Sequence, residues 1–75
     1  MSSKIKEFDV VALHIDLPDA GLCAGQTGTV VYVHNDGEAF EVEFPIEARR
    51  SVVETVDAKD LLKLLNLGIR RAQAG

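Results

Sequence analysis

The sequence predicts a single, mainly β domain. Four runs rich in β-branched and aromatic residues alternate with segments that contain glycine, proline, asparagine or aspartate, as in short strands joined by turns. The 75 residues, with a mass of 8.1 kDa, allow one hydrophobic core, because a domain needs at least about 50 residues. A single cysteine excludes an intramolecular disulfide, so side-chain burial and hydrogen bonds must hold the fold. We therefore interpret residues 1–75 as one domain.

The first strand is predicted at residues 8–13, and the strongest strand signal lies at residues 29–34, which are rich in valine. Residues 16–28 connect the two strands and contain three glycines and one proline. Leu17 and Leu22 lie inside this connection. We therefore expect it to fold back on the core.

A third strand is predicted at residues 40–44, where apolar and acidic residues alternate with period two. Residues 35–37, Asn-Asp-Gly, form the hairpin turn that precedes it. Pro45 is expected to end the strand, since proline cannot donate a ladder hydrogen bond. A fourth strand is predicted at residues 51–56.

The register of the central hairpin has two solutions. A two-residue turn pairs Val33 with Phe40 and directs Tyr32 to solvent. A three-residue turn with its glycine in the left-handed conformation pairs Val30 with Val42 and Tyr32 with Phe40. We favour the three-residue turn because it buries the larger side chain, that of Tyr32.

The C-terminal part also permits two interpretations. Residues 57–67 can form a helix, which gives an α+β domain with a C-terminal helix on a four-stranded sheet. Alternatively, residues 57–60 form one helical turn and residues 61–65 a last short strand. The predicted core comprises Val10, Leu13, Leu22, Phe40, Val42, Phe44, Val53 and Leu61.

Several short motifs resemble those of a family of small bacterial proteins known only as a domain of unknown function. They are Asp-Val-Val-Ala-Leu at 9–13, Asp-Leu-Pro at 16–18, Gly-Leu at 21–22, Gly25, Gly-Thr-Val-Val at 28–31 and Glu-Val-Glu-Phe at 41–44. The family in turn resembles SH3-like five-stranded barrels. The resemblance covers residues 7–65 and implies an all-β, SH3-like five-stranded barrel with a C-terminal helical turn or short helix, followed by an extension at residues 66–75.

Acidic residues are concentrated in one part of the chain. Residues 7–48 contain nine acids and no lysine or arginine, whereas the whole chain carries a net charge of −4. Both hairpin registers place Glu41 and Glu43 on the solvent face, with Asp36 and Glu38 near the turn. Such a face suits a protein partner with a basic surface. These four acids are the predicted binding residues of a protein-interaction module, such as an antitoxin or immunity protein that masks a nucleic-acid-acting enzyme.

Nucleic-acid or ribosome-associated binding is the alternative function. Phosphate recognition relies on basic grooves, and the acidic stretch would repel a phosphate backbone. Only two arginine pairs, at 49–50 and 70–71, favour this alternative. We therefore expect no nucleic-acid partner.

The sequence contains no constellation typical of catalysis, metal binding or a cofactor. His14, His34 and Cys23 are far apart in sequence, and no close pair of zinc ligands is present. We predict that the protein is not an enzyme and holds neither a metal nor a cofactor. No apolar run approaches the length of a membrane span, and the N-terminus lacks a signal-peptide core, so a cytoplasmic location is expected.

Five leucines occur within residues 61–67, more than one face of a small barrel can bury. Exposed apolar patches often mark interfaces. We therefore predict a weak homodimer formed through Leu62, Leu64, Leu65 and Leu67.

Overall fold

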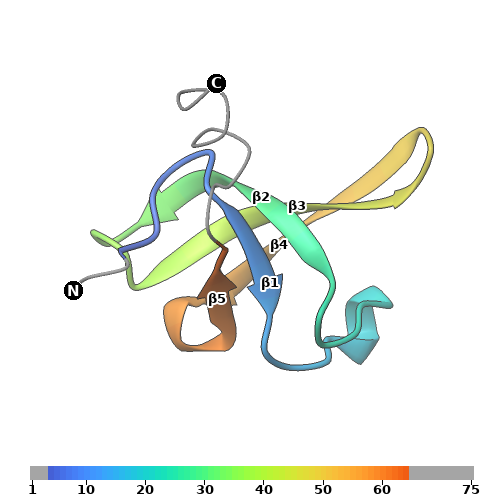
Figure 1. Cartoon of the computed structure of the whole chain (residues 1–75), viewed down its shortest axis with the longest axis horizontal. Coiled ribbons are helices and arrows are strands. Elements are labelled where there is room, and N and C mark those ends of the chain that lie inside the picture. The colour runs from blue at the N-terminus through green and yellow to red at the C-terminus, as the bar shows by residue number, and fades with distance from the viewer. Residues whose placement is uncertain (1–3, 65–75) are drawn as a thin grey trace, which may run out of the picture.

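The computed structural model describes residues 4–64, which fold into one five-stranded antiparallel sheet (Figure 1). The strands are β1 (Val10–Leu13), β2 (Thr27–His34), β3 (Ala39–Glu47), β4 (Arg50–Asp57) and β5 (Leu61–Lys63). Two 3-10 turns complete the fold, η1 (Pro18–Ala20) and η2 (Ala58–Asp60). The strand order β4-β3-β2-β1-β5 and the bend of the sheet around its core give an SH3-like fold, as predicted.

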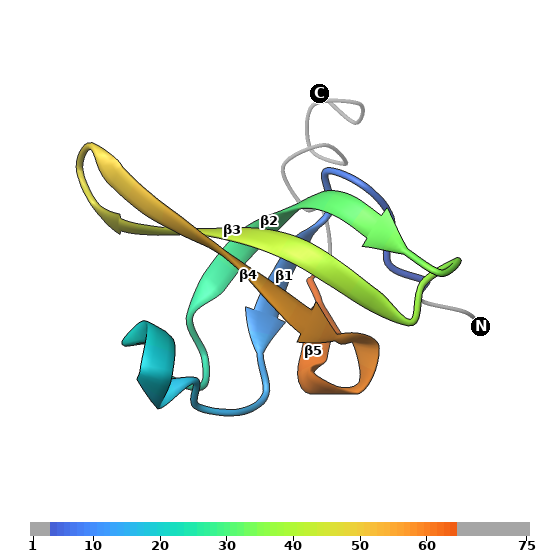
Figure 2. The same ribbon diagram turned by 180° about the vertical axis from the view of Figure 1, so that it is seen from behind.

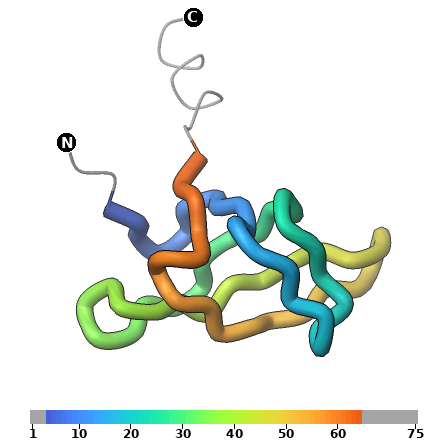
Figure 3. Tube along the Cα trace, turned by 90° about the horizontal axis from the view of Figure 1, so that it is seen from below, coloured from blue at the N-terminus to red at the C-terminus, as the bar shows by residue number. Residues whose placement is uncertain are grey.

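The C-terminal part of the described chain is a turn followed by a strand. η2 is a single 3-10 turn, and β5 pairs with β1 so that Leu62 lies opposite Ala12. The α+β alternative, which needed a helix from residue 57 onward, is therefore wrong for residues 57–64. Because β1 and β5 pair, the two ends of the described chain come to the same side of the molecule (Figure 3).

The core lies on the concave face of the sheet, and six of its eight predicted members are buried. These are Leu13, Leu22, Phe40, Val42, Phe44 and Leu61. Val10 and Val53 are instead 37% and 52% exposed. Side chains alternate between the two faces of a strand, so Val11 replaces Val10 in the core and Val56 takes an inward position on β4.

The connection between β1 and β2 folds back on the core, as expected. Leu17 and Leu22 form an isolated bridge, and Leu22 is 2% exposed. The Asp16 carboxylate accepts a hydrogen bond from the Ala24 N–H at 2.8 Å, which closes the connection. The first strand itself is shorter than predicted. It starts at Val10, because Phe8 adopts a φ of 73° in the turn before it.

The central hairpin combines both predicted registers. Val30 pairs with Val42, and Val33 pairs with Phe40, because a β-bulge between Val30 and Tyr32 inserts one extra residue into β2. Tyr32 is 56% exposed, so the favoured prediction that it is buried is wrong.

β3 and β4 continue past the rest of the sheet as a two-stranded arm (Figures 1 and 2). Pro45 was expected to end the strand, but it pairs with Ser51, and β3 runs on to Glu47. The pairing of β2 with β3 stops at Glu43, so Pro45 has a neighbouring strand on one side only. A missing N–H is tolerated at such a position.

Candidate protein-interaction face

The convex side of β2, β3 and β4 carries a band of polar and apolar side chains, which we call the outer face. The strand registers pair Tyr32 with Glu41, Glu41 with Thr55, and Glu43 with Val53. These residues alternate with the buried Phe40, Val42 and Phe44. The outer face comprises Tyr32, His34, Glu41, Glu43, Ser51, Val53 and Thr55.

Glu41 lies at the centre of a hydrogen-bonded bridge across the three strands. Its Oε2 accepts from Nε2 of His34 and from Oγ1 of Thr55, both at 2.7 Å. The bond from His34, and then the one from Thr55, lowers the pKa of Glu41 below its ordinary value of 4.5, against a smaller opposing effect of burial. Glu41 is therefore a positioned, ionised carboxylate, with its side chain 28% exposed.

Tyr32 and Val53 give the outer face its apolar character. The Tyr32 ring meets the His34 ring edge to face, with centroids 4.9 Å apart and planes at 67°. Val53 stands directly opposite Glu43, whose Oε2 accepts from the Ser51 hydroxyl at 2.7 Å. Both apolar side chains are more than half exposed and lie next to oriented carboxylates.

The four acids predicted to form one surface are divided by the fold. Glu41 and Glu43 lie on the outer face of β3. Asp36 lies in the β2–β3 turn and lines a hollow at one end of the barrel. Glu38 is exposed in the same turn, and its backbone carbonyl accepts from the Ala58 N–H at 2.9 Å.

Sequence reasoning did not assign Val53 and Thr55 to the outer face, and it placed Tyr32 there only in the hairpin register that was not favoured. Val53 and Thr55 face outward because they pair with Glu43 and Glu41, and Tyr32 faces outward because of the bulge in β2. The alternation of residues 40–44 correctly placed Glu41 and Glu43 on the outward side of β3.

The predicted self-association residues are only partly described. Leu62 is 50% exposed on β5, at the edge of the sheet, and Leu64 is partly buried. Leu65 and Leu67 lie outside the described residues, as do the arginines at 70–71.

His34 contacts one carboxylate, that of Glu41, which falls short of a metal-binding cluster. Among residues 4–64, no group of three or more histidine, cysteine, aspartate or glutamate side chains is arranged to hold a metal ion. His14 and Cys23 are both exposed and belong to the start and the end of the β1–β2 connection. In the same part of the chain, no helix is both long and apolar enough to cross a membrane.

A family model described as a domain of unknown function, DUF4926, matches residues 7–49, more than half of the chain. The chain belongs to the DUF4926 family. The matched segment of this DUF4926 protein includes β1, the β1–β2 connection, β2 and β3, and it carries Tyr32, Glu41 and Glu43 of the outer face. Searches of curated proteins and of solved structures gave no significant match.

Proposed function

We propose that this DUF4926 protein is a non-catalytic, cytoplasmic interaction module that binds a basic surface of another protein through its outer face. In this role it resembles an antitoxin or immunity protein, which masks the nucleic-acid-binding surface of an enzyme. The observation that carries the proposal is the combination of Tyr32 and Val53, both largely exposed, with the oriented carboxylates of Glu41 and Glu43.

The composition of the outer face supports a protein partner. Interfaces are enriched in tyrosine, and a residue that combines a large ring with a hydroxyl loses little conformational entropy on binding. Tyr32 presents such a ring, and the outer face, as far as residues 4–64 form it, contains no lysine or arginine. A partner can therefore bury the ring and Val53 while its own basic groups meet the two glutamates.

Charge supports a basic partner. Nine acids and no lysine or arginine occur between residues 7 and 48, the stretch that contains β1, β2 and β3. Complementary charge raises association rates and disfavours partners of the wrong sign. A phosphate backbone carries the same sign as this face and is repelled by it.

The test uses the full chain as bait in an extract of the native cells, with three immobilised proteins compared side by side. They are the wild type, Glu43→Lys, and the control Asp19→Lys, which makes the same charge change in η1. We expect one protein to be retained by the wild type and by Asp19→Lys, to be released by salt, and to be lost from Glu43→Lys. Tyr32→Ala should weaken retention as well, without altering its salt dependence.

Two results would contradict the proposal. Equal retention by all three baits would show that the outer face is not the binding site. Retention of nucleic acid, lost when Arg49 and Arg50 at the end of the arm are changed to alanine, would favour the nucleic-acid alternative instead.

A further inference from the structure

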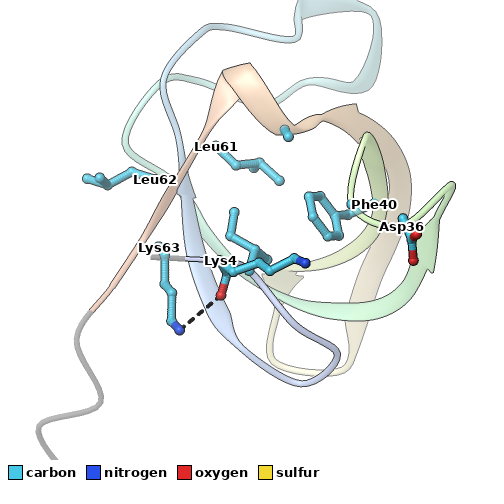
Figure 4. Close-up of a pocket in the computed structure, with 9 residues that line it drawn as sticks. Lys4, Asp36, Phe40, Leu61, Leu62 and Lys63 are labelled. Atoms are coloured by element: carbon cyan, nitrogen blue, oxygen red, sulfur yellow. Dashed lines mark hydrogen bonds between the residues drawn. The ribbon is translucent and has the colours of Figure 1, made fainter. Parts of the chain in front are cut away.

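A hollow of about 340 Å³ opens at one end of the barrel (Figure 4), and none of the outer-face residues lines it. Segments distant in sequence enclose it: the residues before β1, the β2–β3 turn, the start of β3, η2 and β5. Its lining consists of Lys4, Ile5, Asp36, Gly37, Phe40, Ala58, Leu61, Leu62 and Lys63. This volume lies at the lower end of the range for small-molecule sites, roughly 300–1,000 Å³.

The floor of the hollow is apolar. Phe40 and Leu61 are core residues that point into it, and Ile5 and Ala58 pack against the same core (Figure 4). Gly37 borders the Phe40 ring from the turn, with a φ of +105°, and a Cβ built on it would lie 4.0 Å from Cζ of Phe40. Phe40 and Leu61 are only 2% and 6% exposed, so they close the base of the hollow, and the partly buried Ile5 and Ala58 give it accessible apolar surface.

Charges of both signs stand at the rim. Lys63 is already engaged, because its Nζ donates to the Lys4 carbonyl at 3.2 Å and lies 3.4 Å from Oδ2 of Asp9. Within residues 4–64, the Lys4 ammonium and the Asp36 carboxylate take part in no ion pair. The two come from separate walls of the hollow, the segment before β1 and the β2–β3 turn (Figure 4).

We propose that the hollow binds a free α-amino acid with an aliphatic or aromatic side chain. The side chain packs on Ile5 and Ala58, above the buried Phe40 and Leu61, the carboxylate meets Lys4, and the ammonium meets Asp36. A ligand with only a carboxylate leaves Asp36 facing a like charge, and a ligand with only an ammonium does the same to Lys4. A zwitterion with one apolar side chain matches all three features, because hydrogen bonds between charged groups add to the burial of the side chain.

Ligand analogues test each feature on the wild-type chain. The ¹⁵N-labelled protein is titrated with L-leucine, and amide shifts are followed by NMR. We expect saturable shifts at residues 4–5, Gly37 and residues 61–63. N-acetyl-L-leucine lacks the ammonium, L-leucinamide lacks the carboxylate, and glycine lacks the side chain. Each should bind at least about tenfold more weakly, since a charged hydrogen bond or a buried side chain contributes 1.4 kcal/mol or more.

Two variants test which rim residue contacts each charged group of the ligand. Lys4→Met should weaken L-leucine about tenfold but should not weaken L-leucinamide, because the amide has no carboxylate for Lys4 to meet and its ammonium is repelled by Lys4. Asp36→Asn should weaken L-leucine but should not weaken N-acetyl-L-leucine, whose carboxylate is repelled by Asp36. Asparagine tolerates the φ of 62° at this position. Lys59→Met and Asp19→Asn remove the same charges from exposed positions outside the lining and serve as controls.

The proposal is overturned by any of three results on folded protein. The first is that L-leucine causes no saturable shift at these amides. The second is that the analogues bind as tightly as L-leucine. The third is that the control variants weaken binding as much as Lys4→Met and Asp36→Asn do. The analogue series needs only the wild type, so it decides the matter even if a variant fails to fold. The outer face takes no part in any of these measurements, so their failure leaves the proposed protein-binding function intact.

Discussion

Glu41 differs from the other acids of the outer face because two neighbouring strands orient it. His34 on β2 and Thr55 on β4 both donate to the same oxygen, and each comes from a different edge of β3. The bridge therefore links three strands through one carboxylate. The same geometry makes Glu41 a poor position for testing the interface, because its replacement removes two hydrogen bonds together with the charge. Glu43 is the cleaner choice, since a single surface bond to Ser51 holds it.

The pH dependence of stability reports on this bridge. The pKa of Glu41 is lowered in the folded state, so its carboxylate stabilises the fold fully above pH 4.5, its ordinary value. That stabilisation is lost as the pH falls through the lowered pKa. We expect the difference in free energy of unfolding between the wild type and Glu41→Gln to shrink below pH 4.5, measured by urea denaturation. Glu38→Gln, in the exposed turn, controls for the loss of one acid, and a difference independent of pH would contradict the expectation.

Gly28 allows β2 and β3 to approach each other closely. A Cβ at this position would lie 2.7 Å from the Glu43 carbonyl oxygen and 2.8 Å from side-chain atoms of Val42 and Phe44. The backbone atom cannot move away without disturbing the ladder. We predict that Gly28→Ala destabilises the protein by roughly 1–3 kcal/mol through overpacking. Urea denaturation measures the effect, and Thr27→Val, at an exposed position on the same strand, should change stability by no more than about 0.5 kcal/mol. A neutral Gly28→Ala would show that the strands can separate without cost.

At the scale of single elements, the sequence predicted strands well and the details of their pairing poorly. The alternation of residues 40–44 indicated β3 and the outward position of its glutamates, because the period of two is a property of the strand alone. The residues of the turn could not determine where Tyr32 points. The bulge in β2 lets Val30 pair as one predicted register requires and Val33 pair as the other requires. Pro45 was misjudged for a related reason. A sequence does not reveal that β2 stops pairing before the proline is reached.

Asp9 joins the segment before β1 to the edge strand β5. Its Oδ2 accepts from the Lys6 N–H at 2.7 Å and lies 3.4 Å from Nζ of Lys63, and the residue is 9% exposed. Removing the carboxylate leaves a partly buried ammonium and a backbone donor without this partner. We predict that Asp9→Ala destabilises the protein by roughly 1–3 kcal/mol and increases hydrogen exchange at residues 4–8 and 61–64.

Asp57 provides the matched control for Asp9. Its Oδ2 lies 3.9 Å from Nζ of Lys59 in an exposed ion pair, and such pairs contribute only about 0–1 kcal/mol to stability. Asp57→Ala should therefore unfold at nearly the same urea concentration as the wild type. An equal loss in both variants would show that burial of the Asp9 pair adds nothing.

At the scale of the whole molecule, the fold separates surfaces that the sequence grouped together. The four acids, close in sequence, belong to two places: the outer face and the turn beside the hollow. Long-range pairing produces this separation, because the turn folds over the open end next to η2 while β3 runs away from it. The resemblance to SH3-like folds predicted five strands with a helical turn near the C-terminus. It could not show that a lysine before β1 and an aspartate in the turn border the same hollow.

Self-association through the edge of the sheet is the remaining prediction for the whole molecule. β5 pairs only with β1, so its other edge has no neighbouring strand among the described residues. Leu62 on this strand is half exposed, and its side chain points outward from the barrel (Figure 4). An unprotected apolar edge favours strand pairing between two copies, which is self-complementary when the strands run antiparallel. We therefore expect a weak homodimer whose population rises with concentration in sedimentation velocity.

Leu62→Asp should keep the protein monomeric over the same range, whereas Ile15→Asp, at an exposed apolar position outside β5, should dimerise like the wild type. A wild type that stays monomeric at the highest concentrations, or an Ile15→Asp variant that is as monomeric as Leu62→Asp, would contradict dimerisation through β5.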